Sequence, residues 1–581
     1  MSGRTHLVLS TPAYAGVQVG DQASPSPTFA QLDPGVRRGG VLVMVVASLA
    51  ATPAAAQSDR AHYVQPYVEV AQAVAADLSN DDVTTYTSLA AGVDAGVNTA
   101  RSQAQISYRY ERRFDWADDQ VTQDVHSGLA RAAVTVAPGL NLEAGGIATR
   151  ARTDIRGAAP GNLVGDVANV SQVYSLYAGP SLATRAGPLN VGASYFVGFT
   201  KVETPDVPGP VPVQRLDYFD TSTSHLAQGS VGTAAGEVFP FAIQLSGAYE
   251  REDASQLDQT YEGWFGRGDV TLPLSGHVAI RGGVGYERIK ATQRDPLVDA
   301  TGAPLLDGNG RYVTDPASPE RIAYDTDGLI YDAGVIWRPS PRLELQASAG
   351  WRYGGETYFG SLSYAIDRNV GLAIVAYDGV ETFGRQLRDG LRELPTAFEA
   401  RPDPFGQQFA GCVFGARPGT GGAGAGGCLN DVFQSIATAS YRARGIDAVL
   451  SASYGRTRFG IGGGYANRRF NAPRSGTGGG VPGIVTYGLE DQSAYAQAFY
   501  GRDLSRISAI DLTVFGSWYS SGLANGLGAG GDVYGGGANA TYSLQLGRLG
   551  TLASIGLYGF DQEGFDTQWS AQALLGARYT F

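Results

Sequence analysis

The sequence predicts an all-β fold, a transmembrane, antiparallel, up-and-down β-barrel of about 22 strands, with about 20 strands as the next alternative. Apolar and polar residues alternate almost without a break from about Val64 to Phe581. Short and long connections largely alternate between these segments, and the chain closes on an alternating segment that ends with phenylalanine. No run of about 18 apolar residues occurs in the body of the chain, so membrane-spanning helices are not expected there.

The N-terminal region predicts export from the cytoplasm. Residues 36–56 carry two arginines, an apolar run and a cleavage motif at Ala54 and Ala56, the pattern of a secretory signal peptide. We interpret residues 1–35, which precede this signal, as a non-native or disordered extension. The mature chain, residues 57–581, is then expected to be a single barrel that begins in the periplasm of a Gram-negative cell.

Individual segments show the two faces of a strand, because successive side chains along a strand point to opposite sides. The segment AQISYRYE, residues 104–111, places Ala, Ile and Tyr on one face and Gln, Ser, Arg and Glu on the other. The segment LELQASAGWRY, residues 343–353, repeats this scheme. A soluble sheet packed on one side gives the same local pattern. A soluble chain of this length would break into domains, so the continuity favours one closed sheet.

The connections fall into two classes, as in outer-membrane barrels with short periplasmic turns and long external loops. Tight turns are expected at 138–139, 185–187, 273–276, 338–342 and 548–550. Long connections rich in Asp, Gly and Pro are expected at 154–170, 203–222, 294–325, 386–431, 471–490 and 521–532. We expect two of them, 294–325 and 386–431, to be notably long external loops.

The two ends of the chain determine the parity of the strand count. Both termini of such a barrel lie in the periplasm, so the number of strands is even. Fifteen segments precede the 386–431 loop and six follow about Thr457. The region 432–455 invites two strands with a turn at Arg444 and Gly445, but parity requires a single long strand there.

The last residues indicate the membrane and one partner. Alternate residues from Trp569 to Phe581 are apolar or aromatic, as in a strand that faces lipid between two aromatic belts. The ending with Tyr579 and Phe581 resembles the C-terminal signal that the β-barrel assembly machinery recognises in bacterial barrels. We therefore expect an outer-membrane protein in contact with lipid and lipopolysaccharide.

The second half of the chain resembles a narrower family. The stretch WRPSPRLELQASAGWRYGG, the segments VETFGRQL and CLNDVF and the ending ARYTF are similar to a family of outer-membrane barrels. That family is associated with exopolysaccharide export loci linked to the exosortase sorting system. The similarity covers roughly residues 328–581. It implies a cellular setting, with polysaccharide or export proteins as partners, and it assigns no functional residue.

Composition and motif spacing disfavour catalytic, cofactor and metal chemistry. The net charge of −12 makes nucleic acid an unsuitable partner. The five histidines are isolated, and no pair has metal-ligand spacing. His126 and Ser127 could join a distant Asp in a hydrolase triad, but no G-x-S-x-G motif accompanies them. We predict no enzyme activity and no cofactor, and we expect His126 to be an ordinary strand residue.

The cysteines, Cys412 and Cys428, lie in one glycine-rich loop with fifteen residues between them. In an oxidising envelope such a pair favours a disulfide, which would stabilise the loop by ~3 kcal/mol in the chain-entropy model. A redox role is expected to show closer spacing, such as C-x-x-C.

Charged residues on the face opposite the lipid are candidates for lining a water-filled lumen. They are Arg109, Glu111, Arg338, Glu344, Arg352 and Arg578. The competing interpretation is that these residues pair across strands and only satisfy the interior.

These features predict a passive pore or secretion conduit, and the resemblance implies a setting in exopolysaccharide export. A barrel of about 20 strands leaves an aqueous lumen unless something plugs it, and no plug domain fits before the first strand. The main alternative is a non-conducting scaffold whose loops hold surface polysaccharide or an envelope partner. An autotransporter, with a passenger in residues 57–300, and an outer-membrane hydrolase are further alternatives.

Overall fold

The computed structural model describes residues 62–79, 82–116, 123–153, 170–204, 217–400, 405, 409, 411–429, 431–434, 436–473, 489–523, 531–563 and 566–581. The expected extension 1–35, the expected signal peptide 36–56 and its cleavage residues Ala54 and Ala56 lie outside the described residues. Within the described part of the chain, no helix combines the length and apolarity needed to cross a bilayer.

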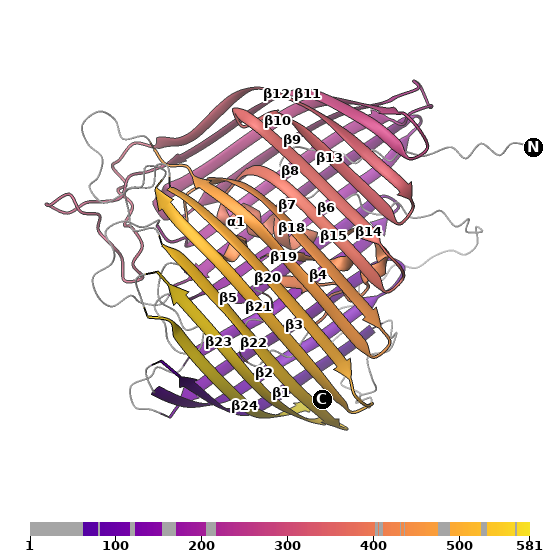
Figure 1. Ribbon diagram of the computed structural model, residues 1–581. Helices are drawn as coiled ribbons and strands as arrows, with labels where there is room; N and C mark the ends of the chain where they lie inside the picture. The colour runs from indigo at the N-terminus through magenta and orange to yellow at the C-terminus, as the bar shows by residue number, and fades with distance from the viewer. Residues whose placement is uncertain are drawn as a thin grey trace, which may run out of the picture.

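The described strands build one closed antiparallel sheet of 22 strands (Figure 1). Each strand pairs with its neighbour in sequence, β15 pairs with β18, and β1 pairs with β24 to close the ring. The first fifteen strands are β1 (His62–Asp77), β2 (Asp82–Asn98), β3 (Ser102–Asp115), β4 (Gln123–Ala137), β5 (Leu140–Arg152), β6 (Val170–Ala186), β7 (Leu189–Glu203), β8 (Thr221–Thr233), β9 (Ala242–Ala254), β10 (Gln259–Pro273), β11 (Val278–Gln293), β12 (Arg321–Ser340), β13 (Leu343–Arg352), β14 (Gly355–Ala365) and β15 (Val370–Glu381). The other seven are β18 (Tyr441–Tyr454), β19 (Thr457–Phe470), β20 (Leu489–Asp503), β21 (Ser508–Leu523), β22 (Asp532–Leu546), β23 (Leu549–Gln562) and β24 (Gln568–Thr580).

The predicted all-β barrel of about 22 strands is therefore confirmed, including the single strand required by parity. Fifteen strands precede the long connection, β18 is one uninterrupted strand, and six strands follow. No turn forms at Arg444 and Gly445, because both residues stay in register between β15 and β19. The autotransporter alternative is wrong, because residues 62–293 form β1 to β11 of the same ring.

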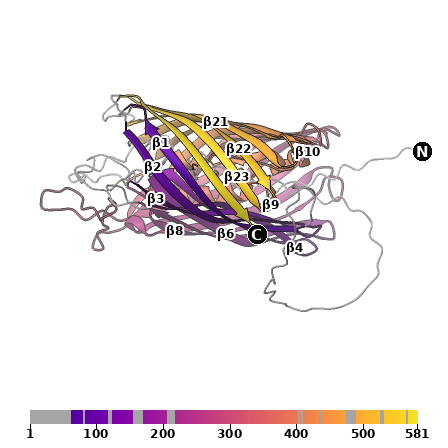
Figure 2. The same cartoon turned by 90° about the horizontal axis from the view of Figure 1, so that it is seen from below.

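The barrel wall is apolar outside and polar or small inside. On β1, Val64 is 70% exposed on the outer face, whereas Glu69 on the inner face is 4% exposed. On the last strand the aromatic residues Trp569 and Tyr579 lie on the outer face with Leu575 between them. The barrel is broad in Figure 1 and shallow in Figure 2, so its cross-section is flattened. An apolar outer wall of this kind is the surface of a membrane-spanning barrel.

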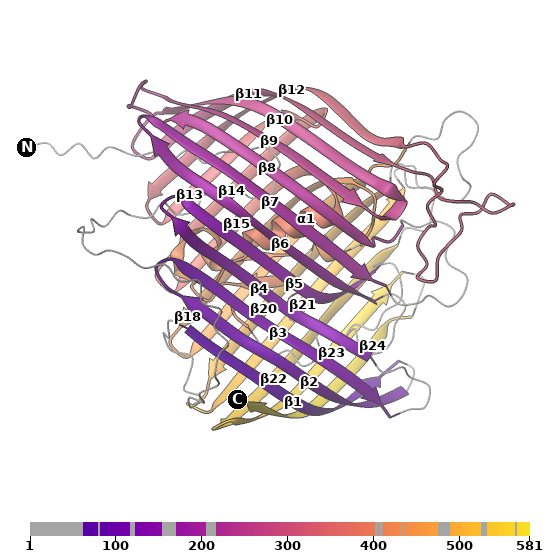
Figure 3. The same cartoon turned by 180° about the vertical axis from the view of Figure 1, so that it is seen from behind.

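The two ends of the barrel differ as expected. The start of β1, the end of β24 and all the predicted tight turns lie at one end, whereas the described long connection 294–320 lies at the other end (Figure 3). Some connections at the long-loop end are short as well, and the tightest of the described ones joins β13 to β14. Its central residues, Tyr353 and Gly354, have φ of 55° and 71°, the left-handed pair that suits a two-residue hairpin. The end with short turns faces the periplasm.

The expectation that residues 386–431 form an external loop is wrong. We call residues 382–440 the lumen connector, because the described residues of this link between β15 and β18 turn inward and lie within the ring (Figures 1 and 3). It contains helix α1 (Phe383–Glu393), the short strands β16 (Cys412–Phe414) and β17 (Gly426–Cys428), and the 3-10 turns η2 (Pro418–Thr420), η3 (Gly422–Ala425) and η4 (Val432–Gln434). The physical reason is the apolar content of the connector, which would be exposed to water outside the barrel.

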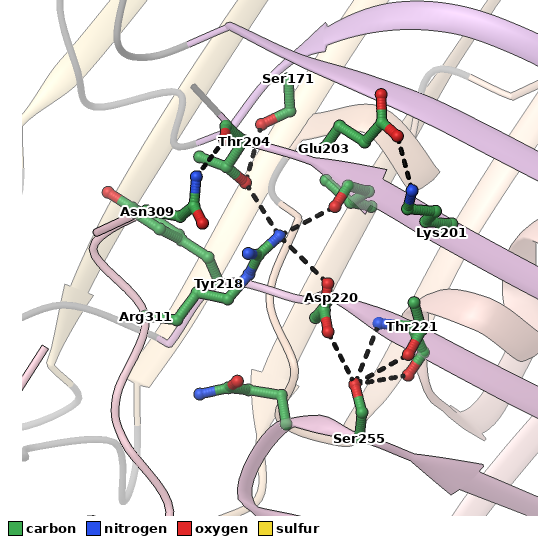
Figure 4. A network of polar contacts seen from close by, with 12 residues as sticks. Ser171, Lys201, Glu203, Thr204, Tyr218, Asp220, Thr221, Ser255, Asn309 and Arg311 are labelled. Carbon is green, nitrogen blue, oxygen red and sulfur yellow. Dashed lines mark hydrogen bonds and ion pairs between the residues drawn. The ribbon is translucent and has the colours of Figure 1, made fainter. Parts of the chain in front are cut away.

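The other long connection expected outside, within 294–325, does lie at the long-loop end. The remaining 3-10 turn, η1 (Gln256–Asp258), is at the same end. Residues 294–320 contain three isolated bridges, Pro296–Thr314, Val298–Pro304 and Leu306–Tyr312, and the last two both lie within the span of the first. Arg311 in this loop donates to the carbonyl oxygen of Val202 at 2.8 Å and lies 3.4 Å from Asp220, as Figure 4 shows. The loop is thereby attached to the rim formed by β7 and β8.

Candidate functional site: the occupied lumen

Helix α1 presents an apolar stripe to the barrel wall. Phe383, Leu387 and Leu391 follow one another at the helical spacing and are fully buried. They join a cluster with inner-face residues of β5 to β8, and the Phe383 ring lies 5.0 Å from that of Phe219. Burial of such side chains contributes about 1.5–3 kcal/mol each. The stripe therefore attaches the helix to the wall along its whole length.

The opposite anchor of α1 is electrostatic. Glu250 on the inner face of β9 receives one hydrogen bond from Arg385 and another, at 2.5 Å, from Nη2 of Arg388. Asp389 accepts from the Nε atom of Arg388 at 2.8 Å. Thr382, just before the helix, donates its hydroxyl to Glu252. These groups have almost no exposure, so the charges neutralise one another inside the lumen.

Burial and charge act in opposite directions on the pKa values of this cluster. Burial alone would raise the pKa of Asp389, but the adjacent Arg388 guanidinium outweighs burial and holds that pKa below its usual value. Burial alone would likewise lower the pKa of Arg385 and of Arg388, and the carboxylates beside them raise both instead. Arg385, Arg388 and Asp389 therefore stay ionised at neutral pH.

The end of α1 is tied to a second wall. Arg131 on β4 donates to the carbonyl oxygens of Arg392 and Leu394 at 2.8 and 3.0 Å. These carbonyls belong to the helix C-terminus, where a cation satisfies groups that have no partner within the helix. Gln105 on β3 then clamps the backbone of Phe398, donating to its carbonyl at 2.8 Å and accepting from its N–H at 3.0 Å.

The middle of the connector is a disulfide-closed hairpin. Cys412 and Cys428 are bonded to each other and stand opposite one another in the β16–β17 pair. The backbone N–H of Cys412 donates to Gln497 on β20 at 2.8 Å. A Cβ atom at Gly462 of β19 would lie 2.6 Å from the Cys412 sulfur, and one at Gly371 of β15 would lie 1.9 Å from a connector carbonyl. Glycine at these wall positions is therefore what lets the hairpin approach.

The last part of the connector is attached to β15, β18 and β19. Asp431 accepts from the Tyr377 hydroxyl and from the Gln386 amide, both at 2.8 Å. Tyr441 donates to Gln386, and the Arg468 guanidinium reaches the carbonyl of Asp431 at 3.4 Å. Burial raises the pKa of Asp431 above its usual value. The connector thus contacts wall strands on both sides of the flattened barrel.

The six predicted lumen residues all lie on the inner face, and all six form ion pairs. Arg109 and Arg578 share Glu69, at 2.7 and 2.8 Å, and Glu111 lies between Arg109 and Arg113. Arg338 pairs with Glu344 at 2.6 Å, and Arg352 pairs with Glu287 at 2.6 Å. The inward orientation agrees with the sequence pattern, while the pairing matches the competing interpretation that these residues satisfy the interior.

Sequence reasoning missed Glu250, Arg385, Arg388 and Asp389, the charges that hold the connector. A signal was present: Phe383, Leu387 and Leu391 have a helical period within a chain that otherwise alternates. No signal pointed to Glu250, which lies 135 residues from Arg385 in sequence.

The hydrolase alternative has no geometric support. His126 lies on the outer face of β4, where its ring nitrogen and the Tyr108 hydroxyl are 2.7 Å apart. Ser127 is buried on the inner face of the same strand, as adjacent strand residues must point to opposite sides. No group of three or more His, Cys, Asp or Glu residues suited to a metal ion occurs in the described segments.

A cavity of about 730 Å³ opens at the periplasmic end of the lumen. We call it the periplasmic vestibule. Its walls come from the periplasmic ends of β1 to β3, from the turns that precede β19 and β21, and from the end of β22, and its roof is connector residues 396–400. A second cavity, of about 80 Å³, lies between α1 and the wall formed by β15 and β18. Described residues of the connector therefore line both cavities.

No family model matches the chain, and no curated protein matches it. Among solved structures, it is similar to the FrpB iron transporter from Neisseria meningitidis, with a TM-score of 0.41, 11% identity and coverage of 89% of this chain and 82% of that one. It is also similar to the siderophore receptor PiuA from Acinetobacter baumannii, with a TM-score of 0.38, 8% identity and coverage of 88% and 82%.

A third similar structure is OccK3 (OpdO) from Pseudomonas aeruginosa, with a TM-score of 0.27, 10% identity and coverage of 89% and 96%. Likenesses this distant carry no argument about what the chain does. The closed 22-strand ring and its apolar outer face are sufficient to identify an outer-membrane β-barrel.

Proposed function

We propose that this protein is an outer-membrane conduit whose lumen is closed at rest by its own connector. The observation that carries the proposal is that α1 is buried in the lumen, where its Arg385 and Arg388 both bind the carboxylate of Glu250 on β9. Rings of 22 strands are wide enough to need a plug. Here the plug is a link between two strands rather than a domain placed before the first strand. The proposal includes no enzymatic step.

The cargo belongs to the proposal as well. The resemblance in residues 328–581 implies that the cargo or the partner is an exopolysaccharide or an export protein, and this part rests on the resemblance alone. Lipopolysaccharide and the β-barrel assembly machinery are the further partners that the apolar wall and the C-terminal residues Tyr579 and Phe581 lead us to propose.

The test is a recording from purified protein in planar bilayers, with and without the connector. Glu381 and Tyr441 are directly paired across β15 and β18, so residues 382–440 can be replaced by a two-residue Asn-Gly turn without changing the register. We expect small or rare current steps for the wild type and a large, stable conductance for the shortened protein. A matched control replaces residues 298–313 of the external loop in the same way and should behave like the wild type.

The scaffold alternative makes a different prediction in the same recording. If the shortened barrel inserts, shifts on heating in gels and still passes no current, the conduit proposal is wrong and the scaffold is supported. If the wild type already conducts as strongly as the shortened protein, the connector does not close the lumen.

A further inference from the structure

The periplasmic vestibule has a charge pattern that differs from that of the chain as a whole. Four arginines line it, with two carboxylates, Glu399 and Asp503. The arginines are Arg417, Arg456, Arg458 and Arg506. The chain carries a net charge of −12, so this excess of positive charge is local. Positive charge concentrated in a cleft attracts anionic solutes.

Three of these arginines are available to a ligand. Arg456 and Arg506 are exposed in the turns before β19 and β21, and Arg417 is exposed in the connector. Within the described residues, none of the three forms an ion pair or a side-chain hydrogen bond. A guanidinium offers five N–H donors in a geometry that matches carboxylate or phosphate oxygens. Three such groups around one cavity therefore provide a surface for an anion.

The fourth arginine links the vestibule to the plug. Arg458 on β19 lies 3.0 Å from Glu399 of the connector, and 3.7 and 3.8 Å from Asp511 and Asp503. Its Nε atom is buried without a hydrogen-bond partner. Glu399 thus places a carboxylate where the carboxylate of a solute would also be attracted. An anion in the vestibule competes with Glu399 for Arg458.

The remaining lining suits a hydroxyl-bearing molecule. Gln65, Asn98 and Gln103 supply amides from the periplasmic ends of β1 to β3, and Ser505 in the turn before β21 and Ser508 at the start of β21 add hydroxyls. A volume of about 730 Å³ is within the usual range for a site that holds a small molecule. The lining therefore combines charge recognition with many neutral donors and acceptors.

We propose that the periplasmic vestibule is a binding site for a carboxylate- or phosphate-bearing solute that approaches from the periplasm. The proposal names the class of solute that the conduit would carry, and in that respect it rests on the proposed function. Binding of the solute at this site does not itself require conduction. The solute is held by Arg417, Arg456 and Arg506 directly beneath the plug.

The test is calorimetric titration of the purified full-length protein with three probes, which are trigalacturonate, inorganic pyrophosphate and neutral maltotriose. We expect saturable, salt-sensitive binding of at least one anion and none of maltotriose, with the preferred anion distinguishing carboxylate from phosphate recognition. The variant Arg417→Ala/Arg456→Ala/Arg506→Ala should weaken anion binding by about a hundredfold, since each lost hydrogen bond at these exposed side chains costs about fivefold.

The matched control removes the same charge from turns at the same end of the barrel. Arg342, Arg368 and Arg548 are exposed and lie outside the vestibule lining, so their triple alanine variant should bind like the wild type. Equal affinities of the two triple variants overturn the proposal, as does absence of anion binding to the wild type. Binding of maltotriose as strongly as the anions also overturns it.

Two single variants keep the test decisive if the vestibule triple variant fails to insert. Arg506→Ala alters only an exposed turn and should weaken binding by about tenfold or less. Glu399→Gln removes the competing carboxylate and should strengthen it several-fold. An unchanged affinity in both variants refutes the site. The outcome is independent of the conduit proposal, which the bilayer recordings test separately.

Discussion

Replacing Glu250 with glutamine isolates the charged anchor of the plug. The change keeps the shape of the side chain but removes the charge that Arg385 and Arg388 share. Loss of one partner from a buried ion pair destabilises by about 3–5 kcal/mol, because the remaining charge is left uncompensated. We take the lower limit, about 3 kcal/mol, because Asp389 still contacts Arg388. The population of protein with α1 released should then rise by about a hundredfold.

Digestion with trypsin measures the population of protein with α1 released, because the arginines of α1 at which trypsin cleaves are buried until the helix leaves the barrel wall. Cleavage that depends on transient opening follows the population of the open form. We expect cleavage within residues 383–393 to accelerate by about a hundredfold in Glu250→Gln, with more frequent current steps in bilayers. The barrel itself should still resist detergent until it is heated.

The control is Glu203→Gln, which breaks the exposed ion pair with Lys201 on β7. Exposed pairs contribute about 0–1 kcal/mol, so cleavage should change little. If Glu250→Gln cleaves no faster than Glu203→Gln, the shared carboxylate does not hold the plug and the electrostatic part of our reasoning is refuted.

Three further predictions follow from the same structure. Replacing Cys412 and Cys428 with serine should loosen the connector by ~3 kcal/mol in the chain-entropy model, seen as faster proteolysis within 411–429 with an unchanged barrel, and unchanged proteolysis would contradict it. The pKa of Asp389 is lowered, so its ionised form stabilises the docked connector. That stabilisation is fully present above the ordinary carboxyl pKa and is lost as the pH falls through the lowered pKa. Single-channel openings should therefore increase only below about pH 4. Deleting Phe581 should impair membrane insertion while leaving synthesis and signal cleavage intact, as judged by loss of the heat-induced gel shift, and normal insertion would show that this residue is no assembly signal.

The wall of the barrel could be predicted from sequence, and the plug could not. Alternation and the placement of turns are local properties, so they located most strands and the turns at the periplasmic end. The parity of the strand count then required β18 to be one strand, against the local pattern. The segment of β9 around Glu250 and Glu252 has charges on both faces, since Arg251 and Asp253 are exposed. Alternation alone therefore could not indicate which carboxylates are buried. Only the fold shows that Glu250 meets a helix more than a hundred residues away.

The position of the connector inside the barrel also could not be predicted from the sequence. Its many glycines and prolines suggested an exposed loop, yet glycine is also what permits two backbones to approach closely. At Gly371 and Gly462 the wall makes room for the disulfide hairpin. The meaning of a glycine-rich sequence thus depended on what lay opposite, which a single sequence does not contain.

Contacts on the inner face of the barrel hold the first and last strands together at their seam, and they bear on whether the barrel can open sideways toward the membrane. Eleven residue pairs join β1 to β24, fewer than the sixteen that join β1 to β2. Glu69 on β1 binds Arg578 on one side of the seam and Arg109 on the other, and Phe405 of the connector packs beside it against inner residues of β1, β23 and β24. Parting these strands would expose an ion cluster to acyl chains. Opening of the seam toward the bilayer is therefore energetically unfavourable, so a conduit through this barrel is expected to run along its axis.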